Sequence, residues 1–293
     1  MGTQDARQKD LARLFAIYLN RGDRVRLVEY LVTHSNLPGP RGNLELAQAF
    51  AEEAAVRTGP DQDKVWTLCL NLAGISPAHA PTNSPMEFLP FCGAVGLGAV
   101  AAASPQRVDR ALTELRRLAD DSRWRTREAA AMALQQLLRH HPQKTLARLK
   151  TWIADEHWLA MRAVAAGIAE PALLDDNPRM AAAALQLHRQ ILQRVRAAAD
   201  RRTESFRTLR QALGYSISVV VTATPKAAFA LLRGLAAARD PDMQWIVREN
   251  LKKQRLVRAD PRQAAALARR ATPSAAATRR HTPSRGGRAS RKG

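Results

Sequence analysis

The chain has 293 residues, of which 46% are hydrophobic and only 5% aromatic, and its formal net charge is +20. This length allows one large domain or two ordinary ones, and the apolar content is sufficient for a core. Cys69 and Cys92 lie in apolar surroundings and the histidines are scattered, which argues against a disulfide framework and against a bound metal.

Periodic apolar residues predict helices along nearly the whole chain, and no run of alternating β-branched residues predicts a strand. Pro105, Pro142 and Pro171 lie at expected breaks, where proline can begin a helix or follow its end. The expected helices are 6–20, 22–34, 44–57, 61–74, 86–103, 106–119, 123–140, 142–153, 157–170, 178–199, 203–222, 225–238, 241–256 and 260–270.

The segment 35–43 contains two prolines and two glycines, so it is not expected to be helical. Asn43 is a suitable N-cap for the helix that follows. The segment is either a structural turn or a ligand-contacting loop that presents Arg41.

The apolar stretch from Phe88 to Ala103 is too short and too rich in glycine and alanine for a membrane span. The N-terminus is polar, so a secretion signal is not expected. A cytoplasmic protein without a membrane partner is expected.

Basic charge is confined to part of the chain. Residues 1–105 have a net charge of −1, residues 106–270 of +15 and residues 271–293 of +6. A compositional bias explains why 38 arginines outnumber 8 lysines, but it does not explain the excess of bases over acids. The positive electrostatic field of residues 106–293 attracts polyanions. Residues 271–293 lack an apolar period and are expected to form a disordered basic tail.

A short pattern occurs three times, each time at an expected helix start. An acid precedes an arginine by six residues, and a tryptophan stands between them. The pairs are Asp121 and Arg127, Glu156 and Arg162, and Asp242 and Arg248; the tryptophans are Trp124, Trp158 and Trp245. Recurrence of one pattern at helical spacing indicates a repeat array.

This pattern resembles the start of the second helix in HEAT repeats. The resemblance implies an all-α fold, an α-solenoid of HEAT-like helix pairs in a right-handed superhelix. The array would span residues 86–270, with residues 1–75 packed on it as an N-terminal helical part. It also implies that the six acids and arginines named above form a structural ladder between successive repeats.

The tryptophans depart from the usual HEAT pattern. They either fill gaps between helix layers or stack on a ligand. Trp124 and Glu128 are four residues apart, as are Trp245 and Glu249, so each pair shares a helix face. The chain is in this respect remotely similar to alkylpurine DNA glycosylases built from HEAT-like repeats, which hold DNA in a basic groove near tryptophans and a carboxylate.

No phosphate loop or catalytic motif is present, so no catalytic residue and no cofactor are expected, and an enzyme is the less favoured hypothesis. The expected function is that of a non-enzymatic scaffold that binds DNA or RNA through phosphate contacts. A protein–protein scaffold is one alternative, and a glycosylase-like alkylation-repair protein is a second. Besides the three tryptophans, the candidate nucleic-acid contacts are Arg189, Arg194, Arg196, Arg201, Arg202, Arg207 and Arg210.

Overall fold

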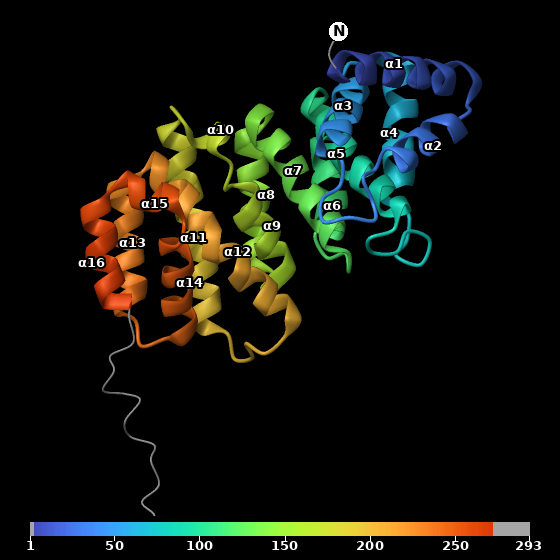
Figure 1. Ribbon diagram of the computed structural model, residues 1–293. Helices are drawn as coiled ribbons and strands as arrows, with labels where there is room; N and C mark the ends of the chain where they lie inside the picture. Colours follow the sequence, from blue (N-terminus) through green and yellow to red (C-terminus); the bar gives the residue numbers. More distant parts are fainter. Residues whose placement is uncertain (1–2, 272–293) are drawn as a thin grey trace, which may run out of the picture.

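The computed structural model describes residues 3–271, which form helices joined by loops with no strand among them (Figure 1). The expected all-α fold is confirmed, while the expected tail, residues 271–293, lies outside the described residues except for Ala271. The N-terminal helices are α1 (Thr3–Arg21), α2 (Val25–Thr33), α3 (Leu44–Ala55), α4 (Gly59–Ala73), α5 (Phe88–Ala102) and α6 (Val108–Leu118). They are followed by α7 (Trp124–His140), α8 (Pro142–Ala154), α9 (Trp158–Gly167), α10 (Pro171–Leu174) and α11 (Pro178–Ala197). The C-terminal helices are α12 (Glu204–Ala223), α13 (Pro225–Ala237), α14 (Pro241–Leu251), α15 (Gln254–Ala259) and α16 (Pro261–Ala271).

The helices of the array alternate between two layers. In the first, which we call the α7 layer, α5, α7, α9, α12 and α14 pack on one another in that order. In the second, α6, α8 and α11 pack in order, and each also packs on two helices of the α7 layer. α13 packs in the same way on α12 and α14. This alternation is the architecture of an α-solenoid, as the repeated pattern predicts.

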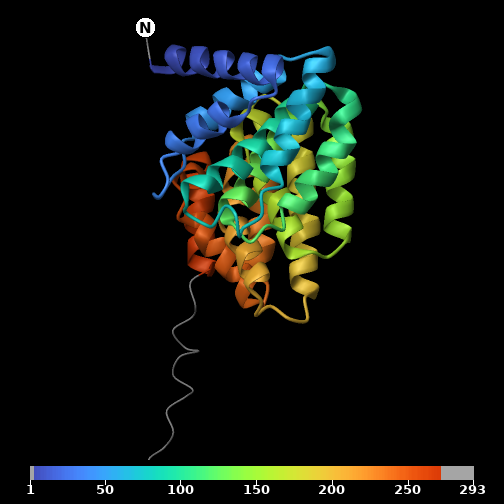
Figure 2. The same ribbon diagram turned by 90° about the vertical axis from the view of Figure 1, so that its right-hand side faces the viewer.

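The N-terminal helices continue the array without a break in the core. α3 and α4 both pack on α5, and α1 packs on α3. One apolar cluster runs from Leu11 in α1 to Leu267 in α16. Figure 2 views the molecule from the end formed by α1 and α2, with the α13–α16 end behind.

Helix α5 is apolar on all sides because it is covered on all sides. The segment Pro85–Ala102 is long and apolar enough to cross a membrane by composition, but 83% of it is buried inside this fold. Its glycines allow close approach, since a Cβ on Gly93 would lie 2.3 Å from the Ala73 nitrogen and one on Gly98 would lie 2.7 Å from the Ala133 Cα. Cys69 and Cys92, buried here, are free thiols, as expected.

Local signals explain most helix starts. The Asn43 side chain accepts a hydrogen bond from the Leu46 amide at 3.0 Å, which confirms the predicted N-cap. Pro142 and Pro171 begin α8 and α10, where their missing amide hydrogens cost nothing. The expected continuous helix 241–256 is wrong, because Lys253 adopts an extended conformation that separates α14 from α15 and allows Leu256 to be buried.

A buried histidine links α11 to α12. The His188 Nδ1–H donates to the Ala184 carbonyl (2.9 Å), which leaves Nε2 to accept from the Ser216 hydroxyl (2.8 Å). Burial lowers the pKa of His188 from 6.5 to about 4. The side chain is therefore neutral in the folded protein at pH values where the unfolded chain takes up a proton.

This difference predicts a loss of stability in mild acid. As the pH falls from 6.5 toward 4, the unfolded chain binds a proton at residue 188 and the folded chain does not, so stability decreases as the pH falls. Between pH 7.5 and 5 the free energy of unfolding should fall by roughly 2 kcal/mol more in the wild type than in His188→Gln. Urea titrations of both proteins at the two pH values measure this, and equal decreases would contradict the assignment.

Candidate nucleic-acid interface

A pocket of ≈ 340 Å³ lies on the α7 layer where α7, α9 and α12 meet. Its lining combines an indole ring, guanidinium groups, hydroxyls, an amide and a carboxylate. The lining residues are Trp124, Arg127, Arg162, Glu204, Thr208, Gln211, Ala212 and Tyr215. Such a lining offers a stacking surface and both charged and neutral hydrogen-bonding groups in one place.

Trp124 presents an aromatic ring to solvent. Its side chain is 46% exposed, and it is the only aromatic among the exposed large hydrophobic residues that the structure describes. The guanidinium carbon of Arg125 lies 4.4 Å from the centroid of the ring. Arg125 is itself buried, donating to Glu87 Oε2 at 2.9 Å and to the Gly39 carbonyl at 2.5 Å. A fixed cation therefore supports the exposed indole from within the protein.

Arg125 also explains the role of two loops. The Gly39 carbonyl belongs to the 35–43 segment, and the Asn83 side chain, which accepts from Arg125 Nη2 at 3.2 Å, belongs to the loop before α5. Asn83 Oδ1 also accepts from the Gly39 amide at 3.0 Å, which ties the two loops together. At Gly39 the 35–43 segment therefore acts as a structural turn, because its backbone carbonyl holds Arg125, the residue beneath Trp124. Arg41 is exposed.

Arg127 carries its charge without a carboxylate of its own. Its Nη1 donates to the backbone carbonyls of Asp121 (2.7 Å) and Ser122 (2.9 Å). The Asp121 carboxylate instead pairs with the buried Arg123 at 2.6 Å. Burial works to raise the pKa of Asp121, but hydrogen bonds from Arg123 hold it below its usual value. Burial and the neighbouring Arg162 lower the pKa of Arg127.

Arg162 connects α9 to α7 beside the pocket. Its Nη2 donates to Glu128 Oε2 at 2.6 Å and its Nη1 donates to the Arg127 carbonyl at 3.0 Å. Across the pocket, burial raises the pKa of Tyr215, so its hydroxyl remains protonated at neutral pH. The site thus holds two guanidinium groups, only one of which is paired with a carboxylate.

The other two tryptophans of the repeated pattern do not present a free ring in this way. Trp158 is partly buried and makes an edge-on contact with Phe206, with 5.4 Å between ring centroids. Trp245 is also partly buried; Arg210 lies 4.6 Å from its ring centroid, and Gly214 allows the ring to pack closely on α12. Both rings therefore fill space between helices.

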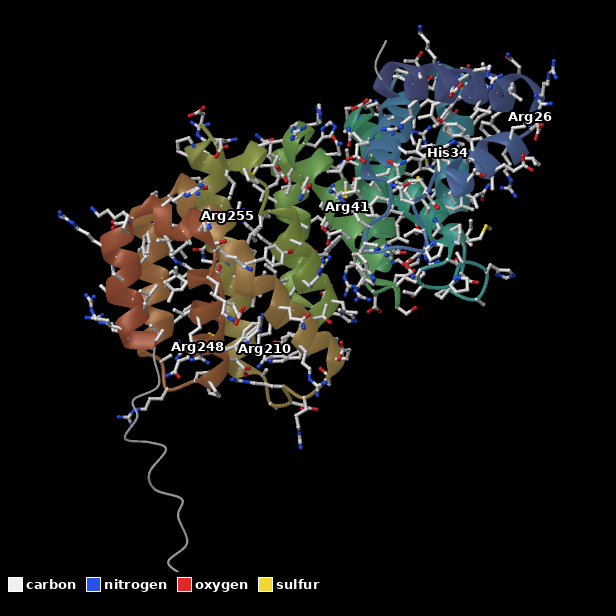
Figure 3. The ribbon with its side chains drawn as sticks, in the orientation of Figure 1. Arg26, His34, Arg41, Arg210, Arg248 and Arg255 are labelled. Atoms are coloured by element: carbon white, nitrogen blue, oxygen red, sulfur yellow. The ribbon has the colours of Figure 1, made fainter. Side chains whose placement is uncertain are left out.

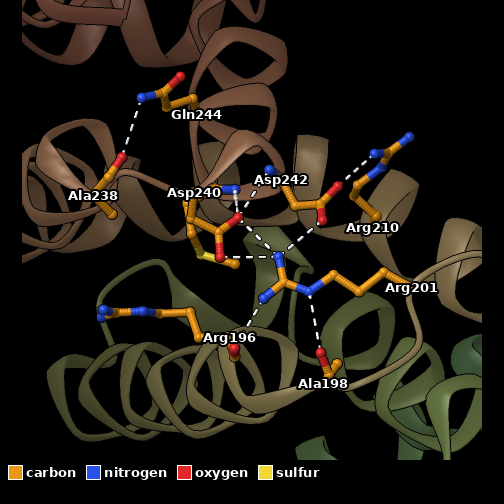
Figure 4. A network of polar contacts seen from close by, with 9 residues as sticks. Arg196, Ala198, Arg201, Arg210, Ala238, Asp240, Asp242 and Gln244 are labelled. Carbon is orange, nitrogen blue, oxygen red and sulfur yellow. Dashed lines mark hydrogen bonds and ion pairs between the residues drawn. The ribbon is translucent and has the colours of Figure 1, made fainter.

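Three of the arginines proposed as nucleic-acid contacts form ion pairs that connect different elements of the fold. Arg201 binds Asp240 and Asp242, at 2.9 and 3.1 Å, and Arg210 binds Asp242 at 2.5 Å (Figure 4). Arg194 binds Glu156 at 2.5 Å. The Arg194 pair connects α11 to the start of α9. The Arg201 and Arg210 pairs connect the α11–α12 loop and α12 to the start of α14.

The remaining four proposed arginines are exposed and belong to α11, to the loop that follows it and to α12. Arg189 and Arg196 lie on α11, in the layer opposite to α7. Arg202 lies in the loop before α12 and Arg207 in its first turns, each 3.6 Å from an acid, Asp200 and Glu204 respectively. They remain candidates for phosphate contacts, and none of them lines the Trp124 pocket.

The ladder residues contact neighbouring helices, but none of the three motif acids forms an ion pair with one of the three motif arginines. Arg162 reaches Glu128 of the preceding unit, and Glu156 and Asp242 receive arginines from α11, α12 and the loop between them. Arg248 donates to the Ala271 carbonyl at 3.4 Å. The motif arginines therefore use backbone carbonyls or acids from other helices.

Sequence reasoning did not single out Tyr215 or Arg125. A signal for the first was available, because Glu204, Thr208, Gln211 and Tyr215 recur at helical spacing and so share one face of α12. Arg125 gave no such signal, since its partner Glu87 is 38 positions away.

Comparison with known proteins yields neither a matching family model nor a matching curated protein. Among solved structures, the chain is similar to a designed armadillo repeat protein at 16% identity and a TM-score of 0.29, covering 78% of this chain and 99% of that one. It is also similar to an engineered protein from a structural genomics consortium at 14% identity and a TM-score of 0.34, covering 85% of this chain and 97% of that one. By its own architecture the described part of the chain is an α-solenoid of helical repeats.

Proposed function

We propose that this protein is a helical repeat scaffold that binds nucleic acid at the Trp124 pocket. The observation that carries the proposal is the half-exposed Trp124 ring beside Arg127 and Arg162. A base would stack on the indole, and the two guanidinium groups would contact the flanking phosphates. Stacking and phosphate contacts together are the usual basis of single-strand binding with little sequence preference.

The contact between Arg125 and Trp124 favours a ligand-binding role for the exposed ring over exposure without a function. The ring lies against the guanidinium group of Arg125, which buried contacts with Glu87 and Gly39 hold in place. A ring that is ordered before binding loses little conformational entropy when a base stacks on it. Arg127 keeps a positive charge that no carboxylate of the described residues pairs with.

Truncation of the ring tests this proposal. Trp124→Ala should weaken binding of a fluorescent single-stranded oligonucleotide by roughly 5- to 100-fold, since stacking of one base contributes about 1–3 kcal/mol. Trp124→Phe, which keeps an aromatic face, should retain most of the affinity. Fluorescence anisotropy at 50 and 200 mM salt measures both variants.

Arg117→Gln provides the matched control, because it removes an exposed charge on α6, in the opposite layer and outside the lining of the pocket. Equal affinities for wild type and Trp124→Ala would exclude the pocket as the binding site. Absence of any binding by the wild type at low salt would exclude nucleic acid and favour a protein partner.

Glu128 favours base excision as a second candidate function. It lies one helical turn beyond Trp124, and its carboxylate is 42% exposed and bound to Arg162. A carboxylate next to a stacking ring is the arrangement that the resemblance to the glycosylases implies. Incubation with DNA containing an N-methylated purine should then release the free base, and Glu128→Gln should abolish the release. Binding without release would leave the protein as a scaffold.

A further inference from the structure

The last two helices carry an almost unopposed positive charge. Residues 252–271 contain seven lysines and arginines and a single acid, Asp260. Both Asp260 oxygens are occupied at the start of α16, accepting from the Gln263 amide at 2.9 Å and from its side-chain nitrogen at 2.7 Å. The acid therefore caps its helix instead of pairing with an arginine in an ion pair.

The arginines of α16 face outward. Ala264, Leu267 and Ala271 form its buried stripe against the preceding helices. Arg262 and Arg269, which are seven residues apart and exposed, share the opposite face. Figure 3 shows nitrogen-tipped side chains projecting into solvent from this end of the ribbon.

Six of these seven cations form no ion pair with a carboxylate of residues 3–271, although Arg262 attracts the nearby Asp260 through space. The exception is Lys252, which pairs with Glu249 at 2.6 Å. Residues 272–293 contain no aspartate or glutamate either, so they supply no neutralising side chain. The six cations are Lys253, Arg255, Arg258, Arg262, Arg269 and Arg270, and we call them the basic end.

Capping of the array does not account for this charge. A terminal helix needs a polar outer face, but that face need not carry one sign of charge. At the opposite end, residues 3–33 contain six lysines and arginines against four acids, and Arg13 lies 3.9 Å from Asp10. The single sign is therefore particular to the C-terminal end.

We propose that the basic end binds the sugar–phosphate backbone of the nucleic acid whose neighbouring nucleotides occupy the Trp124 pocket. This inference rests on the proposed function. α14 connects the two sites, because it packs both on α12, which lines the pocket, and on α16. Arg248 of α14, labelled in Figure 3, lies on this connection and donates to the Ala271 carbonyl.

The chemistry of the basic end fits phosphates and not bases. Residues 252–271 include no aromatic side chain on which a base could stack. Five of the seven cations are arginines, whose planar guanidinium groups bind phosphate oxygens in pairs. The basic end therefore adds affinity that depends on salt and on the length of the nucleic acid, and it does not read sequence.

The test uses two triple variants of the full chain that remove the same charge. Arg255→Gln/Arg262→Gln/Arg269→Gln changes the basic end, and Arg21→Gln/Arg24→Gln/Arg26→Gln changes exposed arginines at the opposite end. The end variant should flatten the dependence of log affinity on log salt for a long oligonucleotide by about two to three units, and the control by less than about one. A short oligonucleotide that fills only the pocket should bind the wild type and the end variant equally.

Equal weakening by both triple variants would overturn the proposal, because it would show a general effect of net charge. Unchanged binding of the long oligonucleotide by the end variant, with Trp124→Ala still defective, would overturn it while leaving the pocket intact. A wild type that binds no oligonucleotide would refute the proposed function and this inference together. Vesicles of phosphatidylglycerol and phosphatidylcholine form a further arm: if the end variant lost vesicle binding but kept binding of the long oligonucleotide, the surface would belong to a membrane instead.

Discussion

Arg125→Ala should lower the free energy of unfolding by about 3–5 kcal/mol, because it leaves the buried carboxylate of Glu87 without its cation. Glu87 is 0% exposed, and the Arg125 side chain is 6% exposed. The same substitution removes the donor that holds the Gly39 carbonyl and the support beneath Trp124. Thermal and urea unfolding of the variant measure the loss.

The double variant Arg125→Met/Glu87→Gln separates an unpaired charge from a general loss of packing. Methionine keeps much of the arginine volume, and glutamine keeps an oxygen to accept from the Asn83 amide, which now lies 2.7 Å from Glu87 Oε2. Since replacement of a whole buried ion pair is often close to neutral, most of the lost stability should return.

The exposed pair of Lys144 and Asp109 provides the control, and Lys144→Ala should cost less than about 1 kcal/mol. If Arg125→Ala were as mild as this control, the buried pair would not be what holds the two loops to α7. If the double variant were no more stable than Arg125→Ala, the loss would come from packing and not from the charge of Glu87.

Asn250→Leu should destabilise the protein by about 2–4 kcal/mol, because it leaves a buried amide without an acceptor. Asn250 is fully buried, and its Oδ1 accepts from the Ser218 amide at 2.8 Å in the middle of α12. Its Nδ2 donates to the Leu213 carbonyl at 2.8 Å. One side chain of α14 thus bonds to the backbone of α12 at two places.

Two further variants and one measurement make this prediction specific. Asn250→Asp keeps the acceptor for Ser218 but loses the donor, so it separates the two bonds. Gln193→Leu makes the same kind of polar-to-apolar change on the exposed surface of α11 and should alter stability by less than about 0.5 kcal/mol. Hydrogen exchange at the Ser218 amide should accelerate in Asn250→Leu before global unfolding; unchanged protection would mean that α12 closes its own hydrogen bond there.

The sequence by itself determined the class of fold, because helix formation depends on neighbours in the chain. Apolar residues at helical spacing, prolines at first turns and the Asn43 cap act over a few residues, and the helices begin and end close to where these signals stand. The repeated pattern at Trp124, Trp158 and Trp245 indicated stacking of similar units, which the two layers confirm.

Only the tertiary structure decided which of these similar residues are available for binding. Trp124 and Trp245 stand three residues before the arginine of the repeated pattern, and Trp158 stands four residues before it. Phe206 covers part of Trp158 and Gly214 allows Trp245 to pack closely, while Trp124 remains half exposed. Phe206 and Gly214 both belong to α12, and each is far in sequence from the tryptophan that it contacts.

The partners of the arginines were decided in the same way. The repeat resemblance implied that Asp121 and Arg127 belong to one ladder, but the Asp121 carboxylate pairs with Arg123, and Arg127 donates to backbone carbonyls. The sequence predicted Arg201 and Arg210 as nucleic-acid contacts, but in the fold both form ion pairs with Asp242. An arginine side chain is long and donates in several directions, so its partner depends on which helices are packed together, and spacing along the chain does not carry that information.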